Sequence, residues 1–468
     1  MLTYDLSERG NTSLYQYLYQ CILQDIRKGV IGPGEQLPSK RVLASHLSVG
    51  LITVENAYAQ LQQEGYIYSI PPRGYFVQSG PSEGIQEASS GEEKEEAEHE
   101  YLVDFKANKS GMSRFPASVW AKLMRQVLSE QSPELLKTVP YNGLFVLRKA
   151  ISDYLRRVRG MQVKPSQIII GAGTEYLYSR LLQLLGGSAV AMEDPGYKKF
   201  GAIADSLKIP WVHIPIDGKG IQTKALAESG AGAVHVSSAN HFPTGIVMPR
   251  QRRRELLEWA YEERERYIIE DDYDSELRYR GKILPTIYAM DRQQRVIYMN
   301  TFSKSLVPSI RISYMVLPDP LMERYRRTLS FYSCTVSSFE QCTLAKFISE
   351  GYLERHVNRQ KTYYKDKRDK VIAALGRSRL IEIARICEHH TGTHFLLKVR
   401  TAMSDEEIRE KAEEKDMHLE LLSGYFHAPE HGTSGTIVIN YASIEPDKID
   451  QAVSTLEKIF EADIEKKD

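Results

Sequence analysis

The chain has 468 residues, of which 42% are hydrophobic and 26% are charged, with 61 basic and 61 acidic side chains. This is an ordinary globular composition with room for two or three domains. No apolar run reaches the about 18–20 residues that cross a bilayer, which excludes a helical membrane protein. Residues 1–5 lack the start of a signal peptide, and the four cysteines form no Cys-x-x-Cys pair. We therefore expect free thiols and a cytoplasmic protein.

Composition divides the chain into residues 1–78, 79–100 and 101–468. The first segment holds six Lys/Arg and six Asp/Glu. The second holds one Lys/Arg and eight Asp/Glu. The second segment has almost no large apolar side chains, so it cannot bury enough surface to order itself. We expect a flexible acidic linker there, with a solvated helix of glutamates as the alternative.

Residues 1–78 show the pattern of a winged helix-turn-helix. Apolar residues form a helical stripe from Leu14 to Ile26, and Ser39 is the candidate N-cap of a second helix. A third helix follows, and its outward face is polar and rich in amides, which is compatible with contacts in a DNA groove. Two strands around the turn 71–74 form a hairpin with Arg73 at its tip. The expected buried face of the third helix is Val54, Ala57, Tyr58 and Leu61.

This segment resembles the winged helix-turn-helix of the GntR regulators over about 65 residues. One departure is the start of the third helix, where Gly50-Leu51 replaces the usual Ser-Arg and removes a DNA contact. The neutral charge of the segment also weakens the case for DNA, and a small helical unit that binds protein is the alternative. The resemblance implies DNA contacts from Ser39, Lys40, Arg41, Thr53, Asn56, Arg73 and Gly74.

From residue 101 onward, short apolar runs alternate with helical patterns. Such runs predict an α/β domain with a mostly parallel sheet that is covered on both faces. The expected strands are 167–170, 189–192, 233–236, 267–270 and 296–299.

Lys304 lies directly after the last of these strands. Thr301 and Ser303 precede it, and Arg311 follows seven residues later. This arrangement predicts a pyridoxal phosphate site, in which the amine forms a Schiff base while the hydroxyls and the guanidinium hold the phosphate. An exposed loop lysine is the alternative. The turn 171–175 opens a helix whose first N–H groups favour a phosphate, which makes Gly173 and Thr174 candidate contacts.

The segment 270–274, Glu-Asp-Asp-Tyr-Asp, ends another apolar strand. An aspartate at this point can pair with a protonated pyridine nitrogen and keep the ring an electron sink. A solvated turn and a magnesium site are the alternatives. The preceding apolar pair Ile268-Ile269 argues against a turn, and Lys304 argues against a metal.

Residues 101–468 resemble the fold type I aminotransferases, which implies a smaller C-terminal α/β subdomain beside the main sheet. The resemblance assigns Asp271 to the pyridine nitrogen and Tyr273 to O3′ of the cofactor. It also stacks Tyr197 on the pyridine ring, although a tyrosine on a surface turn is the alternative. The family's Asn-Pro-Thr-Gly loop is altered here, so either Asn240 or His241 is expected to reach O3′.

The whole chain is similar to the MocR (GabR-like) regulators, in which a GntR-type head is joined to an aminotransferase-like body. This resemblance implies a transcriptional regulator that holds pyridoxal phosphate as an internal aldimine on Lys304. The expected partners are a promoter with two half-sites, a head-to-tail homodimer, and an effector that is an amino compound or pyridoxal phosphate itself.

A carboxylate clamp is missing from the sequence. Aminotransferases use a C-terminal arginine for this purpose, but the strand-like segment 436–441 has none, and Lys199 and His427 lie in segments that could compensate. Without a bidentate clamp the substrate is loosely oriented, so we expect weak or partial transamination at most. The alternative function is an active class I aminotransferase with a vestigial head.

Overall fold

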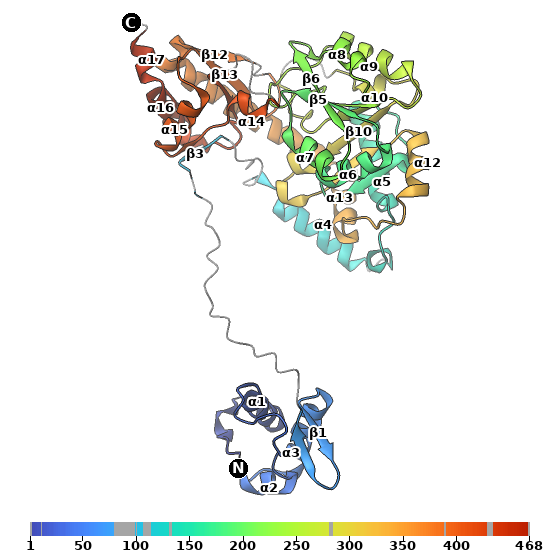
Figure 1. Ribbon diagram of the computed structural model, residues 1–468, viewed down its shortest axis with the longest axis vertical. Helices are drawn as coiled ribbons and strands as arrows, with labels where there is room; N and C mark the ends of the chain where they lie inside the picture. The colour runs from blue at the N-terminus through green and yellow to red at the C-terminus, as the bar shows by residue number, and fades with distance from the viewer. Residues whose placement is uncertain are drawn as a thin grey trace. The chain divides into compact units, whose positions relative to one another are not determined.

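The computed structural model describes residues 2–10, 12–78, 99, 101–105, 114–130, 133–279, 284–387, 390–427 and 434–466. The chain divides into two compact units, Met1–His99 and Glu100–Asp468 (Figure 1). The expected linker, 79–100, lies outside the described residues except for His99. Within the described ranges, no helix is both long and apolar enough to span a membrane. The four cysteines are free, as expected.

The N-terminal unit is a three-helix bundle with a hairpin. Its elements are α1 (Leu14–Arg27), α2 (Lys40–His46), α3 (Leu51–Gln63), β1 (Ile67–Ile70) and β2 (Gly74–Val77). Ser39 caps α2 as predicted, because its hydroxyl accepts the N–H of Val42 at 3.3 Å. The predicted face of α3 is buried and packs against Leu18 and Ile22 of α1. Tyr58 of that face meets Tyr75 of the hairpin edge-on, which joins the wing to the bundle.

The C-terminal unit is built on an eight-stranded sheet with the order β4-β11-β10-β9-β8-β5-β6-β7. Strands β11 and β7 run opposite to the others, so the sheet is mostly parallel. All five predicted strands are present within two residues of their expected ends. The eight strands of the sheet are β4 (Ile168–Gly171), β5 (Val190–Asp194), β6 (Trp211–Asp217), β7 (Gly220–Ile221), β8 (Ala233–Val236), β9 (Tyr267–Asp271), β10 (Val296–Thr301) and β11 (Ser313–Val316).

Helices cover both faces of this sheet. Successive residues of a strand point to opposite faces, so Ile268 packs into one hydrophobic layer and Ile269 into the other. This explains why the strands are continuously apolar rather than alternating. On the face of Ile269 lie α6 (Thr174–Leu185), α7 (Lys198–Ser206) and α12 (Asp319–Thr328). The opposite face is covered by α4 (Ala117–Ser129), α5 (Phe145–Tyr154), α8 (Thr223–Glu228), α9 (Arg250–Glu262), α10 (Ile287–Met290) and α13 (Ser338–Ser349).

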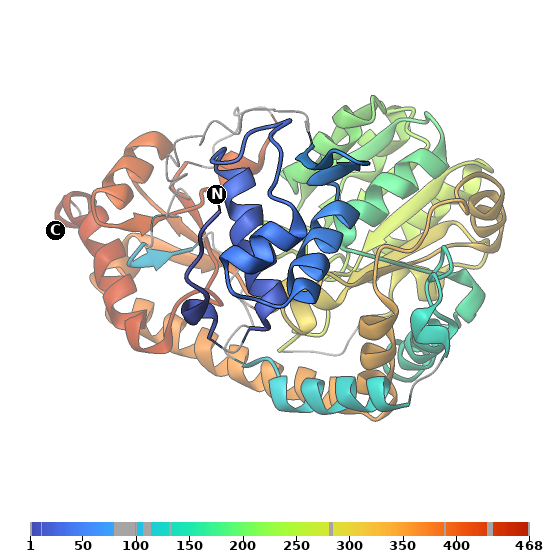
Figure 2. The same ribbon diagram turned by 90° about the horizontal axis from the view of Figure 1, so that it is seen from below.

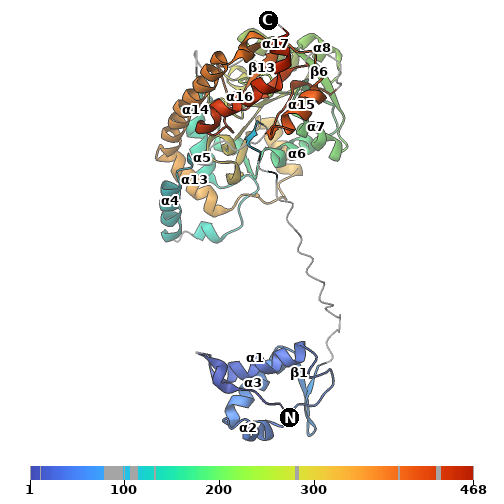
Figure 3. The ribbon, with the colours of Figure 1, turned by 90° about the vertical axis from the view of Figure 1, so that its left-hand side faces the viewer.

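A smaller α/β lobe follows, also as predicted, and lies beside the large sheet (Figure 2). Its antiparallel sheet has the order β12-β13-β15, and its longest helix, α14, packs against α16 (Figure 3). The start of the unit joins this lobe, because β3 (Val103–Asp104) pairs with β14 (Met417–His418). The other elements are β12 (Ala384–Cys387), β13 (Phe395–Val399), β15 (Thr436–Ile439), α14 (Tyr352–Arg377), α15 (Asp405–Glu413), α16 (Ile449–Ile459) and α17 (Glu461–Glu465).

Candidate cofactor site and DNA-reading face

The predicted cofactor residues lie at the ends of neighbouring strands. β5, β8, β9 and β10 are parallel, so their carboxyl ends share one edge of the sheet, where ligands bind in folds of this class. Gly173 follows β4, and Tyr197 follows β5. Asn240 follows β8, and Asp271 is the last residue of β9. The fold therefore gathers residues that are more than 100 positions apart in the sequence.

Lys304 lies on α11 (Phe302–Ser305), a short helix that begins where β10 ends. Thr301 caps this helix, since its Oγ1 accepts the N–H of Ser303 at 3.1 Å. Lys304 and Asp274 line the same small cavity. Burial lowers the pKa of the Lys304 amine, while the nearby Asp274 carboxylate acts in the opposite direction. A lowered pKa makes the neutral, nucleophilic amine more accessible.

Asp271 is buried at the end of β9 and faces His235 on β8. The distance from His235 Nε2 to Asp271 Oδ2 is 3.7 Å, and in the described structure Asp271 Oδ1 has no hydrogen-bond partner. A buried carboxylate oxygen without a partner calls for a ligand that donates a hydrogen bond. The N–H of a protonated pyridine is such a donor.

Asn240 and Tyr273, the two residues expected near O3′, lie together. Asn240 Nδ2 is 3.3 Å from Tyr273 Oη and donates to Asp274 Oδ2 at 2.7 Å. Thr391 of the small lobe fixes the amide by donating to Asn240 Oδ1 at 2.8 Å. The alternative residue, His241, instead bonds to Thr244 at 2.7 Å. The geometry therefore favours Asn240.

Hydroxyls gather at the expected phosphate end of the site. Ser313 Oγ donates to Thr301 Oγ1 at 2.8 Å, and Thr174 Oγ1 lies 3.5 Å from Ser313 Oγ. Ser303 Oγ is buried and makes no hydrogen bond in the described part of the chain. Thr301 and Ser303 lie at the start of α11, and Thr174 lies at the start of α6. N–H groups at helix starts favour anions.

Arg311 and Gly173 meet at the same end. Arg311 Nη2 donates to Glu175 Oε2 at 2.8 Å, which holds the guanidinium beside the start of α6. Gly173 has φ +100°, and a Cβ there would lie 2.3 Å from Arg311 Nη2. A larger residue at position 173 would therefore displace the guanidinium as well as strain the backbone.

Tyr197 stands at the start of α7 and is 40% exposed. Its ring meets Phe200 and Phe242 edge-on, with centroid distances of 5.3 and 6.0 Å. The tyrosine thus belongs to an aromatic cluster at the strand ends, and its ring is exposed, as the surface-turn alternative also expects.

The acidic segment 270–274 is neither a solvated turn nor a cluster that points to one centre. Glu270 accepts the Ser238 hydroxyl at 2.5 Å and two backbone N–H groups at the start of α10, so it stabilises that helix. Asp272 accepts from Arg159 Nη2 and Tyr298 Oη, both at 2.6 Å. These neighbours are structural, and Asp271 alone of the three consecutive acids faces the candidate site.

The donor set fits pyridoxal phosphate. Lys304 offers an amine, Asp271 an unpaired carboxylate oxygen, and Ser303 an unpaired hydroxyl. His235 is the site residue that sequence reasoning missed. The sequence did contain a signal for this residue, because His235 is the single polar side chain within an otherwise apolar strand, Ala233–Val236.

The candidates for a substitute carboxylate clamp do not form one. Lys199 is 64% exposed and lies 3.8 Å from Glu175 Oε1. The His427 ring stacks on His213 with 3.7 Å between the centroids. Thr436 is buried at the start of β15 and carries no charge.

The residues predicted to contact DNA differ in how exposed they are and in whether they already contact other groups of the protein. Arg41, Asn56 and Arg73 are exposed, whereas Lys40 lies 3.8 Å from Glu55 and over the Tyr75 ring. Thr53 is half-buried in the first turn of α3, and Ser39 uses its hydroxyl to cap α2. Gly74 begins β2 and pairs with Ile70.

Two apolar side chains stand at the start of α3. Leu51 is 39% exposed and Ile52 is 71% exposed. They occupy the end of the recognition helix that enters the major groove in helix-turn-helix proteins.

Comparison with known proteins agrees with this architecture. Residues 14–77 match the gntR family of bacterial regulatory proteins, and residues 102–456 match the aminotransferase class I and II family. The chain is 37% identical over 448 residues to the HTH-type transcriptional regulator YdeL of Bacillus subtilis, covering 95% of this chain and 96% of that protein. It is 29% identical over 477 residues to the probable rhizopine catabolism regulatory protein MocR of Rhizobium meliloti, covering 97% and 95%.

The body alone resembles solved aminotransferases. The kynurenine aminotransferase of Pyrococcus horikoshii superposes with a TM-score of 0.69 at 22% identity, covering 78% of this chain and 92% of that one. The fold is thus that of a type I aminotransferase, preceded by a GntR-type head. The chain therefore belongs to the MocR subfamily of GntR transcriptional regulators, DNA-binding proteins whose aminotransferase-like domain depends on pyridoxal phosphate.

Proposed function

We propose that this regulator holds pyridoxal phosphate covalently through Lys304 and responds to an amino compound, or to the cofactor itself, by changing how its heads bind DNA. The observation that carries the proposal is a half-buried lysine at the strand-end edge that also holds two buried polar atoms without hydrogen-bond partners in the described structure, Asp271 Oδ1 and Ser303 Oγ. When bound, the cofactor supplies an aldehyde that condenses reversibly with primary amines. An amino compound can then compete with Lys304 for it.

The remaining site residues receive the following roles. Asn240 and Tyr273 hold O3′, while Thr174, Thr301 and Arg311 hold the phosphate together with the backbone at Gly173. Tyr197 stacks on the ring. His235 fixes the orientation of the Asp271 carboxylate, because its imidazole approaches one oxygen and leaves the other for the ligand.

Residues 1–78 act as the DNA-binding domain, 79–100 as a linker and 101–468 as the effector domain. Arg41 and Arg73 bind phosphates, and Asn56 reaches base edges. Leu51 stands where the family has an arginine, and Leu51 and Ile52 present apolar surface at the start of α3. We assign the more exposed Ile52 to the methyl group of a thymine. A homodimer places two heads on two half-sites. An effector that binds one arrangement of the dimer more tightly shifts the equilibrium, and a coupling of about 1–3 kcal/mol suffices.

Footprinting on the promoter upstream of its own gene tests this proposal. We expect salt-dependent protection of two spaced half-sites that changes when an amino compound is added. The same protein should turn over amino and keto acids slowly or only through half-reactions. Rapid multiple turnover without any protection would instead establish the alternative, an active aminotransferase with a vestigial head.

A further inference from the structure

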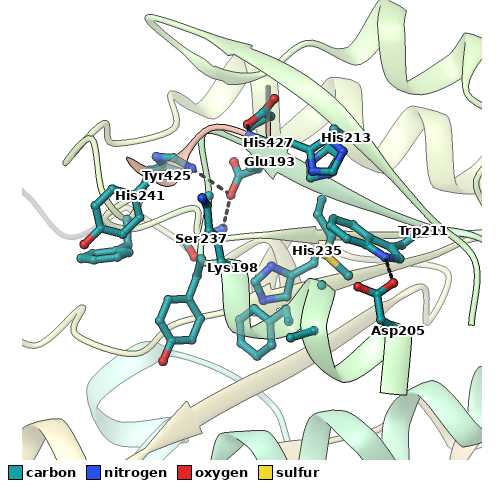
Figure 4. A pocket seen from close by; sticks show the side chains of 18 residues that line it. Glu193, Lys198, Asp205, Trp211, His213, His235, Ser237, His241, Tyr425 and His427 are labelled. Carbon is teal, nitrogen blue, oxygen red and sulfur yellow. Dashed lines mark hydrogen bonds and ion pairs between the residues drawn. The ribbon is translucent and has the colours of Figure 1, made fainter. Parts of the chain in front are cut away.

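A second cavity lies beside the cofactor site, between β5, α7, β6 and the residues after the short helix Leu422–Tyr425 (Figure 4). Its volume is about 290 Å³. Tyr197 and His235 line it and also belong to the cofactor site. Lys304, Ser303 and Arg311 do not line it, so the cavity is separate from the expected aldehyde and phosphate positions.

Glu193 presents an unused acceptor to this cavity. Its side chain is 5% exposed, and Oε2 accepts the N–H of Ser237 at 3.0 Å. The second oxygen, Oε1, has no hydrogen-bond partner in the described structure. The two ring nitrogens of His213, which also lines the cavity, are buried and without partners too. Glu193 Oε1 is an acceptor, and a neutral imidazole adds one acceptor and one donor nitrogen. Burying such groups is costly unless a ligand supplies hydrogen-bond partners.

The charges and walls of the cavity favour a cation. Three carboxylates, from Glu193, Asp194 and Asp205, line it against the single ammonium of Lys198. Trp211 and other aromatic rings form much of the wall, and aromatic faces attract cations. Asp205 Oδ1 accepts the N–H of Trp211 Nε1 at 2.7 Å, and Asp194 Oδ1 accepts the backbone N–H of His427 at 3.0 Å. Glu193 differs from both because its Oε1 is buried without a partner in the described structure.

We propose that this cavity binds the ammonium group of a small amine, with Glu193 as its counter-ion and the aromatic wall around its alkyl part. The binding site stands without the regulatory function proposed above, and only its effect on DNA binding rests on that function. Tyr197 and His235 connect the two sites, because a ligand that touches them also touches the residues expected at the pyridine ring and at Asp271.

Burial raises the pKa of Glu193 to about 8, whereas it lowers the pKa of His213 and lowers that of His241 to about 3. The imidazoles thus stay neutral near pH 7, and a bound cation would favour the ionised form of Glu193. Affinity for a cation should therefore increase as the pH rises from 6 through 8. The titratable groups that face Glu193 or line the cavity are Asp194, Tyr197, Lys198, Asp205, His213, His235, His241, Tyr425 and His427.

The test uses a tertiary amine, because it cannot condense with the cofactor aldehyde. N,N-dimethylethylamine is titrated into the full-length, cofactor-loaded protein by calorimetry. The uncharged N,N-dimethylacetamide serves as the control of similar size. We expect the amine to bind more tightly than the amide, and more tightly at pH 8 than at pH 6.

The matched variant is Glu193→Gln, whose amide oxygen can still accept the Ser237 N–H. It should bind the amine about tenfold more weakly or worse, since a charge-assisted hydrogen bond is lost. The visible absorbance of its bound cofactor should not change, which separates this site from the Lys304 site. Equal affinity of the variant, or equal affinity for amine and amide, would overturn the proposal even if the cofactor site is correct.

Discussion

His235 on β8 approaches Asp271 on β9 with 3.7 Å between Nε2 and Oδ2. The two strands are parallel neighbours, so the imidazole and the carboxylate meet at the edge where both strands end. One carboxylate oxygen is directed to the histidine, and the other has no partner among the described residues. The two oxygens of Asp271 therefore differ, and Oδ1 is the one available to a hydrogen-bond donor in the candidate site.

Asp271→Asn should weaken cofactor binding. The change removes the charge that a protonated pyridine nitrogen would pair with, and a charged hydrogen bond contributes about 1.5–3 kcal/mol. The dissociation constant should therefore rise about 10- to 100-fold. Titration of the apoprotein with pyridoxal phosphate, followed by absorbance, measures it. An unchanged constant would remove Asp271 from the cofactor site.

The neighbouring residue provides the control for this experiment. Asp272→Asn breaks the contact with Arg159 and Tyr298 in the interior, so it should lower the thermal stability of the apoprotein. Asp271→Asn should leave that stability almost unchanged. If the two variants behaved alike, the division between a cofactor residue and a structural residue would be wrong.

Sequence reasoning located the strands well because this sheet is buried on both sides. The runs around Ile169 and Ile268 are continuously apolar, which is a strong local signal. The order of polar residues at the strand ends then placed Asp271 and Lys304 at one edge. The face of α3 was also predictable, since burial at i, i+3, i+4 and i+7 is a local pattern.

Contacts between distant segments could not be predicted. Thr391 holds Asn240 across 151 positions, and β3 pairs with β14 more than 300 residues away. Trp211 and His213 of strand β6 are half-buried. This strand therefore lacks the continuous apolar run from which the central strands were predicted. The cavity at Glu193 depends on these same long-range contacts, and no sequence motif indicated it.

Lys304→Ala should abolish the visible absorbance of lysine-bound pyridoxal while leaving some noncovalent binding. Ser303→Ala is the matched neighbour. It should keep the absorbance and weaken the affinity by about 1 kcal/mol, because one hydroxyl contact to the phosphate is lost. An unchanged spectrum of the Lys304 variant would contradict the assignment of the Schiff base to this residue.

Acid should destabilise the body through its buried histidines. Burial, together with the nearby Lys304, lowers the pKa of His394 from 6.5 to about 4. Between these values the unfolded chain binds a proton that the folded chain does not, so stability is lost as the pH falls from 6.5. At pH 5 this amounts to about 2 kcal/mol for one such imidazole.

Denaturant unfolding of the apoprotein at pH 7 and pH 5 measures this loss. All three tryptophans lie after residue 100, so their fluorescence reports on the body and not on the head. His394→Asn should make the loss between the two pH values smaller by about 2 kcal/mol. The same loss in variant and wild type would show that His394 does not contribute.

Leu51→Arg should strengthen DNA binding and its dependence on salt. An added phosphate contact steepens the plot of log affinity against log salt by about 0.9. Leu136→Arg is the control. Leu136 is an exposed aliphatic residue of the other unit, and its replacement by arginine adds the same charge. If both variants changed the slope equally, position 51 would not be close to the DNA backbone.

The assignment of Ile52 to thymine can be tested by removing one methyl group at a time from the operator. Replacing a contacted thymine by uracil should weaken binding by about 1 kcal/mol, the value of one buried methyl group. Ile52→Ala should bind both operators equally, since the apolar partner is then absent. Uracil outside the protected half-sites should have no effect on either protein. If Ile52→Ala retained the full preference for thymine, the methyl contact would belong to another residue.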